Sequence, residues 1–64
     1  MDDFKVRLIN ERKELKERIG KLSAFMLTTV FAKLPEIDRK LLLEQAVYMS
    51  GYADILDQRV DRLV

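Results

Sequence analysis

Apolar residues between positions 41 and 63 fall into two rows at helical spacing. The first row recurs every seven residues and consists of Leu42, Met49, Leu56 and Leu63. The second row repeats at the same interval and consists of Leu41, Tyr48 and Ile55. At about 100° per residue, the two rows lie roughly 100° apart around a helix, so one neighbouring helix cannot cover both. The segment therefore predicts one helical partner inside the chain and another outside it.

An apolar row of the same kind runs along the N-terminal part of the chain and predicts the inner partner. It consists of Phe4, Leu8, Leu15, Ile19, Leu22 and Met26. Asp2 or Asp3 is placed to cap this helix, and Pro35 suits the first position of the second helix, where a missing backbone donor costs nothing. Thr28 and Thr29 are better helix caps than interior residues, so a separate turn before Pro35 is also expected.

These patterns predict an all-α protein with a single domain, 1–64, folded as a coiled-coil-like antiparallel hairpin of two helices. Helix one should span about 3–27, the connection about 28–35 and helix two about 36–63. A chain of 64 residues without cysteine has a small core and no disulfides, so oligomerisation is the remaining route to stability. We expect the hairpin to assemble into a homo-oligomeric helical bundle.

Composition narrows the classes of function. The chain contains no histidine and no cysteine, and its serines have no histidine to activate them, so we expect neither an enzyme nor a cofactor or metal site. Twelve basic and eleven acidic residues nearly balance, which argues against polymeric nucleic acid as a partner. The apolar run AFMLTTVFA is shorter than a membrane span and follows no basic leader, so we expect a soluble protein without a membrane partner.

Antiparallel pairing predicts which residues share a side of the hairpin. If Met26 lies beside Leu42, flanks of the same rotational sense on the two helices lie on the same side of the pair. The resulting composite face carries five candidate ligand-binding residues, Arg7, Arg18, Tyr48, Tyr52 and Arg59. Arginine binds phosphate and tyrosine can stack on a base or fill an interface between copies. The candidate residues for an oligomer interface are Phe25, Leu41, Tyr48 and Ile55.

Two polar residues fall close to the predicted core rows. Glu11 should pair with Arg7 or Arg59, and Gln45 should set the register of the two helices. The alternative is that both residues orient arginines toward a bound ligand. Gly20 and Gly51 are either chance surface glycines or points of close approach for another backbone or a ligand.

The motifs of the chain also resemble those of a family of very small bacteriophage proteins related to a hypothetical protein of crAss-like phages. The likeness covers nearly the whole chain and rests on Arg7 and Glu11, the run Glu14 to Leu22, the signature Leu41, Leu42 and Gln45, then Met49 and Tyr52, and finally Leu56, Arg59 and Val60. Gly20 and Gly51 depart from the family pattern, so no family role is carried onto them.

The hairpin architecture is similar to that of short phage proteins that sequester nucleotide second messengers of bacterial immunity, such as anti-CBASS and anti-Thoeris sponges. This likeness implies an oligomer that binds a cyclic nucleotide or an ADP-ribose-type signal in the cytoplasm of the infected bacterial host. A helical adaptor or inhibitor that binds a host or virion protein through its apolar face is the alternative. An apolar stripe left uncovered after self-assembly would favour the adaptor.

Overall fold

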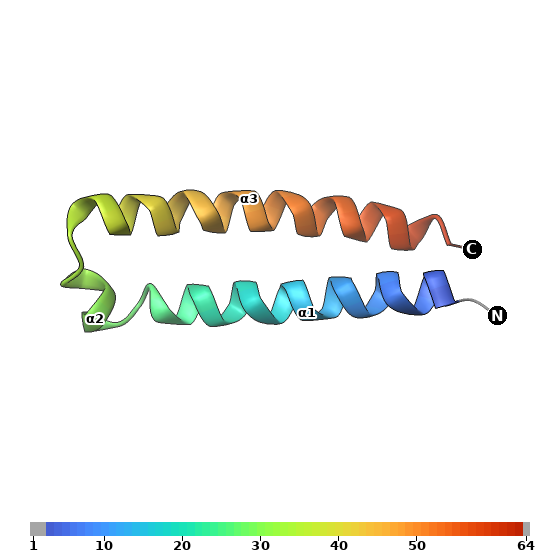
Figure 1. Cartoon of the computed structure of the whole chain (residues 1–64), viewed down its shortest axis with the longest axis horizontal. Coiled ribbons are helices and arrows are strands. Elements are labelled where there is room, and N and C mark those ends of the chain that lie inside the picture. The colour runs from blue at the N-terminus through green and yellow to red at the C-terminus, as the bar shows by residue number, and fades with distance from the viewer. Residues whose placement is uncertain (1–2, 64) are drawn as a thin grey trace.

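The computed structural model describes residues 3–63 and places them in three helices, which confirms the all-α prediction for this part of the chain. Helix α1 spans Asp3–Phe25, the short helix α2 spans Thr29–Ala32, and helix α3 spans Glu36–Asp61. The two long helices lie side by side and antiparallel, so both termini are at the same end of a rod of 48 × 15 × 13 Å (Figure 1). Asp2, one of the two expected caps, lies outside the described residues, and Asp3 contributes an acidic side chain to the first turn.

The connection between the long helices is a structured turn because its polar groups have local partners. The Thr28 hydroxyl donates to the Phe25 carbonyl at 2.6 Å and accepts from the Phe31 amide at 3.2 Å, so it binds the last residue of α1 and caps α2. Phe25 packs edge-on against Phe31, with ring centroids 6.0 Å apart. Arg39 closes the turn by donating to the Ala32 carbonyl at 3.0 Å. Pro35 is the N-cap of α3 rather than its first helical residue.

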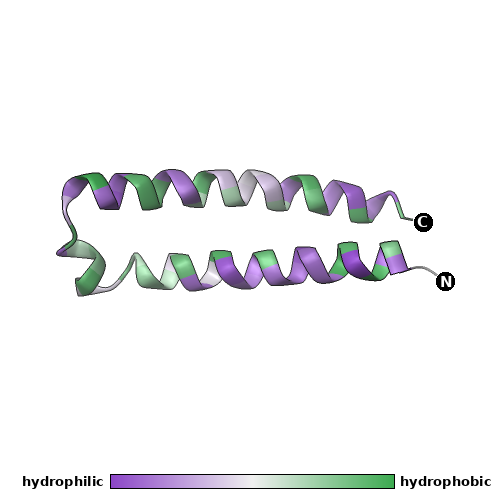
Figure 2. Ribbon diagram, in the orientation of Figure 1, coloured by the Kyte–Doolittle hydropathy of each residue, from purple (hydrophilic) through white to green (hydrophobic). Residues whose placement is uncertain are grey.

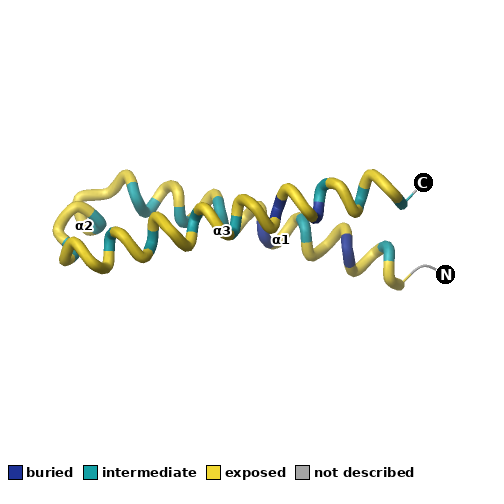
Figure 3. The backbone as a smooth tube through the Cα atoms, turned by 90° about the horizontal axis from the view of Figure 1, so that it is seen from above, coloured by how far each residue is buried: buried dark blue, intermediate teal, exposed yellow. Residues whose placement is uncertain are grey.

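Four residues are buried between α1 and α3, namely Leu8, Leu15, Ala53 and Leu56. Partly buried apolar residues pack against them, namely Ile19, Met49, Val60 and Leu63. The buried positions lie toward the end of the rod that carries the termini, whereas the connection end shows intermediate and exposed positions (Figure 3). Phe4 belongs to the predicted core row but is 54% exposed, because α1 begins there and α3 covers little of its first turn. The core is therefore a narrow seam in one half of the hairpin.

Much apolar surface remains in contact with solvent. The chain exposes 5151 Å², whereas a globular protein of the same 7.5 kDa mass exposes about 4,250 Å². Hydrophobic segments occur along both long helices and dominate α2 and the last turn of α1 (Figure 2). None of the helices within residues 3–63 combines the length and the apolar character that crossing a membrane requires. This excess of exposed surface indicates that the faces of the rod are available to binding partners.

Candidate functional site

Asp57 establishes the register of the two long helices and one side of the hairpin. Its Oδ1 atom lies 2.9 Å from Lys16 Nζ and 3.5 Å from Arg12 Nη1, so position 57 of α3 lies beside positions 12 to 16 of α1. The hydrogen bond from Lys16 is the largest effect and lowers the pKa of Asp57 below its ordinary value of 3.8; desolvation opposes it, and the charges of Lys16 and Arg12 add smaller effects that also lower the pKa. We call Arg12, Lys16 and Asp57 the paired flank.

The opposite side of the hairpin carries arginines from both helices. Arg7 and Glu11 of α1 and Arg59 of α3 line a surface hollow of about 330 Å³ together with Phe4 and Leu8. A second hollow, of about 240 Å³, is lined by Phe4, Leu8, Arg59, Arg62 and Leu63. Both hollows thus share Phe4, Leu8 and Arg59. We call Phe4, Arg7, Arg59 and Arg62 the arginine cluster.

The predicted ion pair of Glu11 is wrong. Glu11 is exposed, and within the described chain no carboxylate oxygen of Glu11 lies within 4 Å of a nitrogen of Arg7 or Arg59. Its rotational position is close to the apolar row, but a helix with a single neighbour buries a narrower strip than the row occupies. Arg7 instead makes a long hydrogen bond of 3.4 Å to the Asp3 carbonyl of its own helix. Glu11 is therefore an acidic group at the edge of the arginine cluster.

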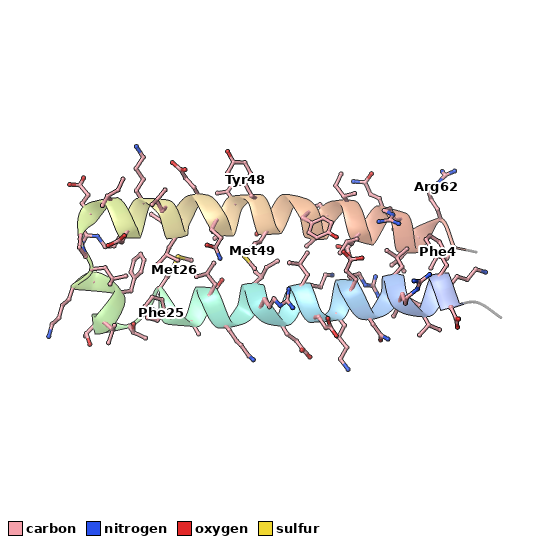
Figure 4. The ribbon with its side chains drawn as sticks, in the orientation of Figure 1. Phe4, Phe25, Met26, Tyr48, Met49 and Arg62 are labelled. Carbon is pink, nitrogen blue, oxygen red and sulfur yellow. The ribbon has the colours of Figure 1, made fainter. Side chains whose placement is uncertain are left out.

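The two tyrosines lie on a separate part of the surface. They border a hollow of about 570 Å³ lined by residues of α3 alone, namely Leu41, Glu44, Gln45, Tyr48, Met49 and Tyr52. Met49 points between the helices and Tyr48, which is 75% exposed, projects from α3 away from α1 (Figure 4). Gln45 is exposed and donates to the sulfur of Met49 at 3.7 Å within the same helix, and it makes no hydrogen bond to α1 within residues 3–63. We call this hollow the tyrosine surface.

The five candidate ligand-binding residues therefore separate into groups. Arg7 and Arg59 line one hollow, while Tyr48 and Tyr52 line another. Along α3, Arg59 lies seven residues from Tyr52 and eleven from Tyr48, which is about 10 Å and about 16 Å at a rise of about 1.5 Å per residue. Arg18 is exposed and lines neither hollow.

The candidate interface residues also differ from one another. Leu41, Tyr48 and Ile55 are exposed, whereas Phe25 is half-buried against Phe31. The apolar row of α3 is thus open along its length, while the aromatic ring at the end of α1 is already in contact within the chain.

Two members of the arginine cluster are not among the candidate residues predicted from the sequence. Phe4 belongs to the predicted core row, and Arg62 lies just beyond the last turn of α3, where it is the C-cap. Their positions in the sequence could have identified them. In an antiparallel hairpin the first turn of α1 lies beside the last turn of α3, so cations and aromatic residues in these two turns are neighbours. A three-residue spacing places Arg59 and Arg62 on neighbouring sides of α3.

Comparison with known proteins identifies the family. A family model described as Sequestin matches residues 2–62. The chain belongs to the Sequestin family. The chain is also similar to the uncharacterized 7.5 kDa protein in the denB-rIIB intergenic region of Enterobacteria phage T4. The two sequences are 30% identical over 57 residues, and the alignment covers 89% of each chain. The expected kinship with small phage proteins is thereby confirmed, and no solved structure shows a significant match.

Proposed function

We propose that this Sequestin-family chain is a non-catalytic phage protein that sequesters a phosphate-bearing nucleotide. The nucleotide would be a second messenger of host immunity, either a cyclic nucleotide or an ADP-ribose derivative, and the protein would act as an oligomer in the cytoplasm of the infected bacterium. The family name supports sequestration as the mode of action. The observation that carries the proposal is that Arg7 and Arg59 line one hollow and Arg59 and Arg62 line a second, with the exposed Phe4 bordering both.

The chemistry of the arginine cluster fits a nucleotide. A guanidinium group can donate two parallel hydrogen bonds to the oxygens of a phosphate, and arginines from two helices can hold both phosphates of a diphosphate or of a cyclic dinucleotide. An exposed aromatic ring beside them offers a face on which a base can stack, worth about 1–3 kcal/mol per base. Phe4 is 54% exposed, so its ring is accessible to such a ligand.

The remaining cations are less available for this role. Arg12 and Lys16 already lie against Asp57. Tyr48 and Tyr52 remain candidates for stacking on a base, and Arg18 for holding a phosphate, if ligand binding extends along the composite face. The sequence supplies no histidine or cysteine to activate a nucleophile, which supports binding without cleavage.

Isothermal titration calorimetry against cyclic dinucleotides, cyclic trinucleotides and ADP-ribose derivatives tests the proposal. We expect one of these classes to bind, and mass spectrometry of the ligand released by denaturation should find it unchanged. Arg59→Gln should weaken binding at least tenfold. Arg18→Gln is the matched control. A loss of affinity as large as that of Arg59→Gln would show that the site extends along the composite face to Arg18. A small loss of affinity would show that the site is confined to the arginine cluster. Failure of all the nucleotides to bind would refute the proposal.

An adaptor that binds a host or virion protein is the second candidate, because apolar residues remain exposed on another side of α3. Leu43 is 53% exposed and Val47 is 68% exposed, and both lie around the helix from the row of Leu41 and Tyr48. If no nucleotide binds, a Val47→Glu variant should disrupt capture of a host protein by the purified chain. Retention of the same partner by this variant would count against the adaptor.

A further inference from the structure

We propose that a second copy of this chain packs antiparallel against α3, with the two-fold axis passing beside Tyr48. This inference extends the assembly assumed in the proposed function, but it rests on the exposed row of α3 and its test requires no ligand. The row consists of Leu41, Tyr48 and Ile55, which are 54%, 75% and 53% exposed, with Ile37 one turn earlier at 59%.

The amount of exposed surface matches what a stable dimer buries. The chain exposes 5151 Å², about 900 Å² more than a globular protein of its mass. A protein–protein interface of standard size removes about 800 Å² from each partner. Covering one face of the rod with a second copy would therefore bring the exposed surface of each chain to the ordinary level.

The row is complementary to itself when two copies run in opposite directions. A two-fold interface requires that residue i contacts residue j of the partner and that j contacts i. Leu41 and Ile55 each lie seven residues from Tyr48, so an antiparallel copy places Leu41 against Ile55 of the other copy twice and pairs the two Tyr48 side chains at the axis. The tyrosine surface is open along this row and is lined by α3 residues alone, so a side chain of the second copy can enter it as a knob enters a hole.

The charges at the ends of α3 select the antiparallel arrangement over the parallel one. Asp38 in the first turn and Arg59 in the last turn lie on the side of α3 that carries the row, whereas Glu36 and Asp61 lie on the far side at about 100° per residue. An antiparallel copy brings Asp38 of one helix near Arg59 of the other. A parallel copy would place like charges together at both ends, which is unfavourable. The exposed apolar row and the end charges therefore point to the same arrangement.

Site-specific cross-linking tests this arrangement directly, because the chain has no cysteine of its own. With Tyr48→Cys, oxidation or a short bis-maleimide should link two copies, since equivalent atoms meet at the axis. Leu41→Cys should not link to itself, because its two positions lie about 21 Å apart along the helix, fourteen residues at about 1.5 Å. Mixing Leu41→Cys with Ile55→Cys chains should give a mixed cross-linked pair. Val47→Cys, which is adjacent to Tyr48 and equally accessible, is the control for random collision.

Several results would overturn the inference. Self-linking of Leu41→Cys would show a parallel dimer, and equal linking of Val47→Cys and Tyr48→Cys would show collision alone. A monomeric mass for the wild-type chain in sedimentation at micromolar concentration would exclude the dimer outright. If Tyr48→Cys weakens the interface, the mixture of Leu41→Cys and Ile55→Cys still decides the matter, since both retain Tyr48. A chain that binds a nucleotide without giving these cross-links would lose this inference and keep the proposed function.

Discussion

On one side of the hairpin, Arg12 and Lys16 lie against Asp57, and on the other side Arg7 and Arg59 line a hollow with Glu11 at its edge. The first side takes both cations from α1, whereas the second takes Arg7 from α1 and Arg59 from α3, and both sides lie along the same half of the hairpin. They differ in the geometry of the acid. Asp57 has a short side chain that reaches both cations, with Oδ1 2.9 Å from Lys16 Nζ and shielded from solvent, whereas Glu11 extends into solvent from the same helix as Arg7.

This difference separates structural cations from cations available to a ligand. A phosphate that approaches the paired flank must displace a carboxylate that already occupies the donors, while a phosphate at the arginine cluster meets guanidinium groups that have no ion pair with Glu11 within 4 Å. Counting basic residues would rate the two sides alike. The positions of the acids decide which side can bind an anion.

The largest expected effect comes from removing the scaffold that both sides share. Leu56 is fully buried, so Leu56→Ala should lower the free energy of unfolding by about 3 kcal/mol, within the range of about 2–5 kcal/mol typical of such cavities. Urea denaturation followed by circular dichroism measures this change. Leu43→Ala removes the same atoms from an exposed position of the same helix and should cost less than about 0.5 kcal/mol. Similar losses for both variants would contradict the position of the core.

A second experiment sharpens the comparison by neutralising each side in turn. Arg7→Gln combined with Arg59→Gln removes two charge-assisted hydrogen bonds of about 1.5–3 kcal/mol each, so nucleotide affinity should fall at least 100-fold. Arg12→Gln combined with Lys16→Gln removes the same charge from the paired flank and should change the affinity less than twofold. Calorimetry with the nucleotide found to bind measures both. Equal losses would show that net charge, and not position, determines binding.

The sequence predicted the scaffold better than the site. Two long helices, their antiparallel order and the turn capped by Thr28 follow from heptad spacing and cap residues, which depend on local geometry. The placement of Arg7 and Arg59 on one side of the hairpin also agrees with the structure, since both line the same hollow.

The predictions of burial are wrong where the rotational angle of a residue around the helix does not decide whether its side chain is covered. Glu11 and Phe4 both fall within the angular range of the core row, yet both are exposed because a single neighbouring helix covers a narrow strip and little of the first turn. The structure also places the arginines and the tyrosines of the composite face in different hollows. A shared face extends along the whole rod, and Arg59 and Tyr48 lie about 16 Å apart on it, so sharing a side does not by itself bring side chains into one hollow.

A third and smaller effect appears as a dependence on pH. The hydrogen bond from Lys16 lowers the pKa of Asp57 in the folded state, so this ion pair stabilises the fold above the ordinary value of 3.8 and is lost as the pH falls through the lowered pKa. The difference in melting temperature between wild type and Asp57→Asn should therefore be present at pH 6 and narrow toward pH 2. Arg12→Gln combined with Lys16→Gln keeps Asp57 but removes its partners, and should show the same narrowing. A difference that does not change with pH would exclude the paired flank as its source.

The smallest expected effect tests the acid at the edge of the arginine cluster. Glu11→Gln keeps the size and hydrogen-bonding capacity of the side chain but removes a negative charge that shares a hollow with Arg7 and Arg59. Removing a like charge from the surroundings of an anionic ligand should raise nucleotide affinity about threefold, roughly 0.7 kcal/mol, and this gain should shrink in high salt because the charges are exposed. Stability in urea should stay within about 0.5 kcal/mol of wild type, since an exposed acid without an ion partner contributes little to folding. A loss of about 3 kcal/mol or more would instead indicate that Glu11 is buried with an arginine, and a fall in affinity would show that it orients the arginines toward the ligand.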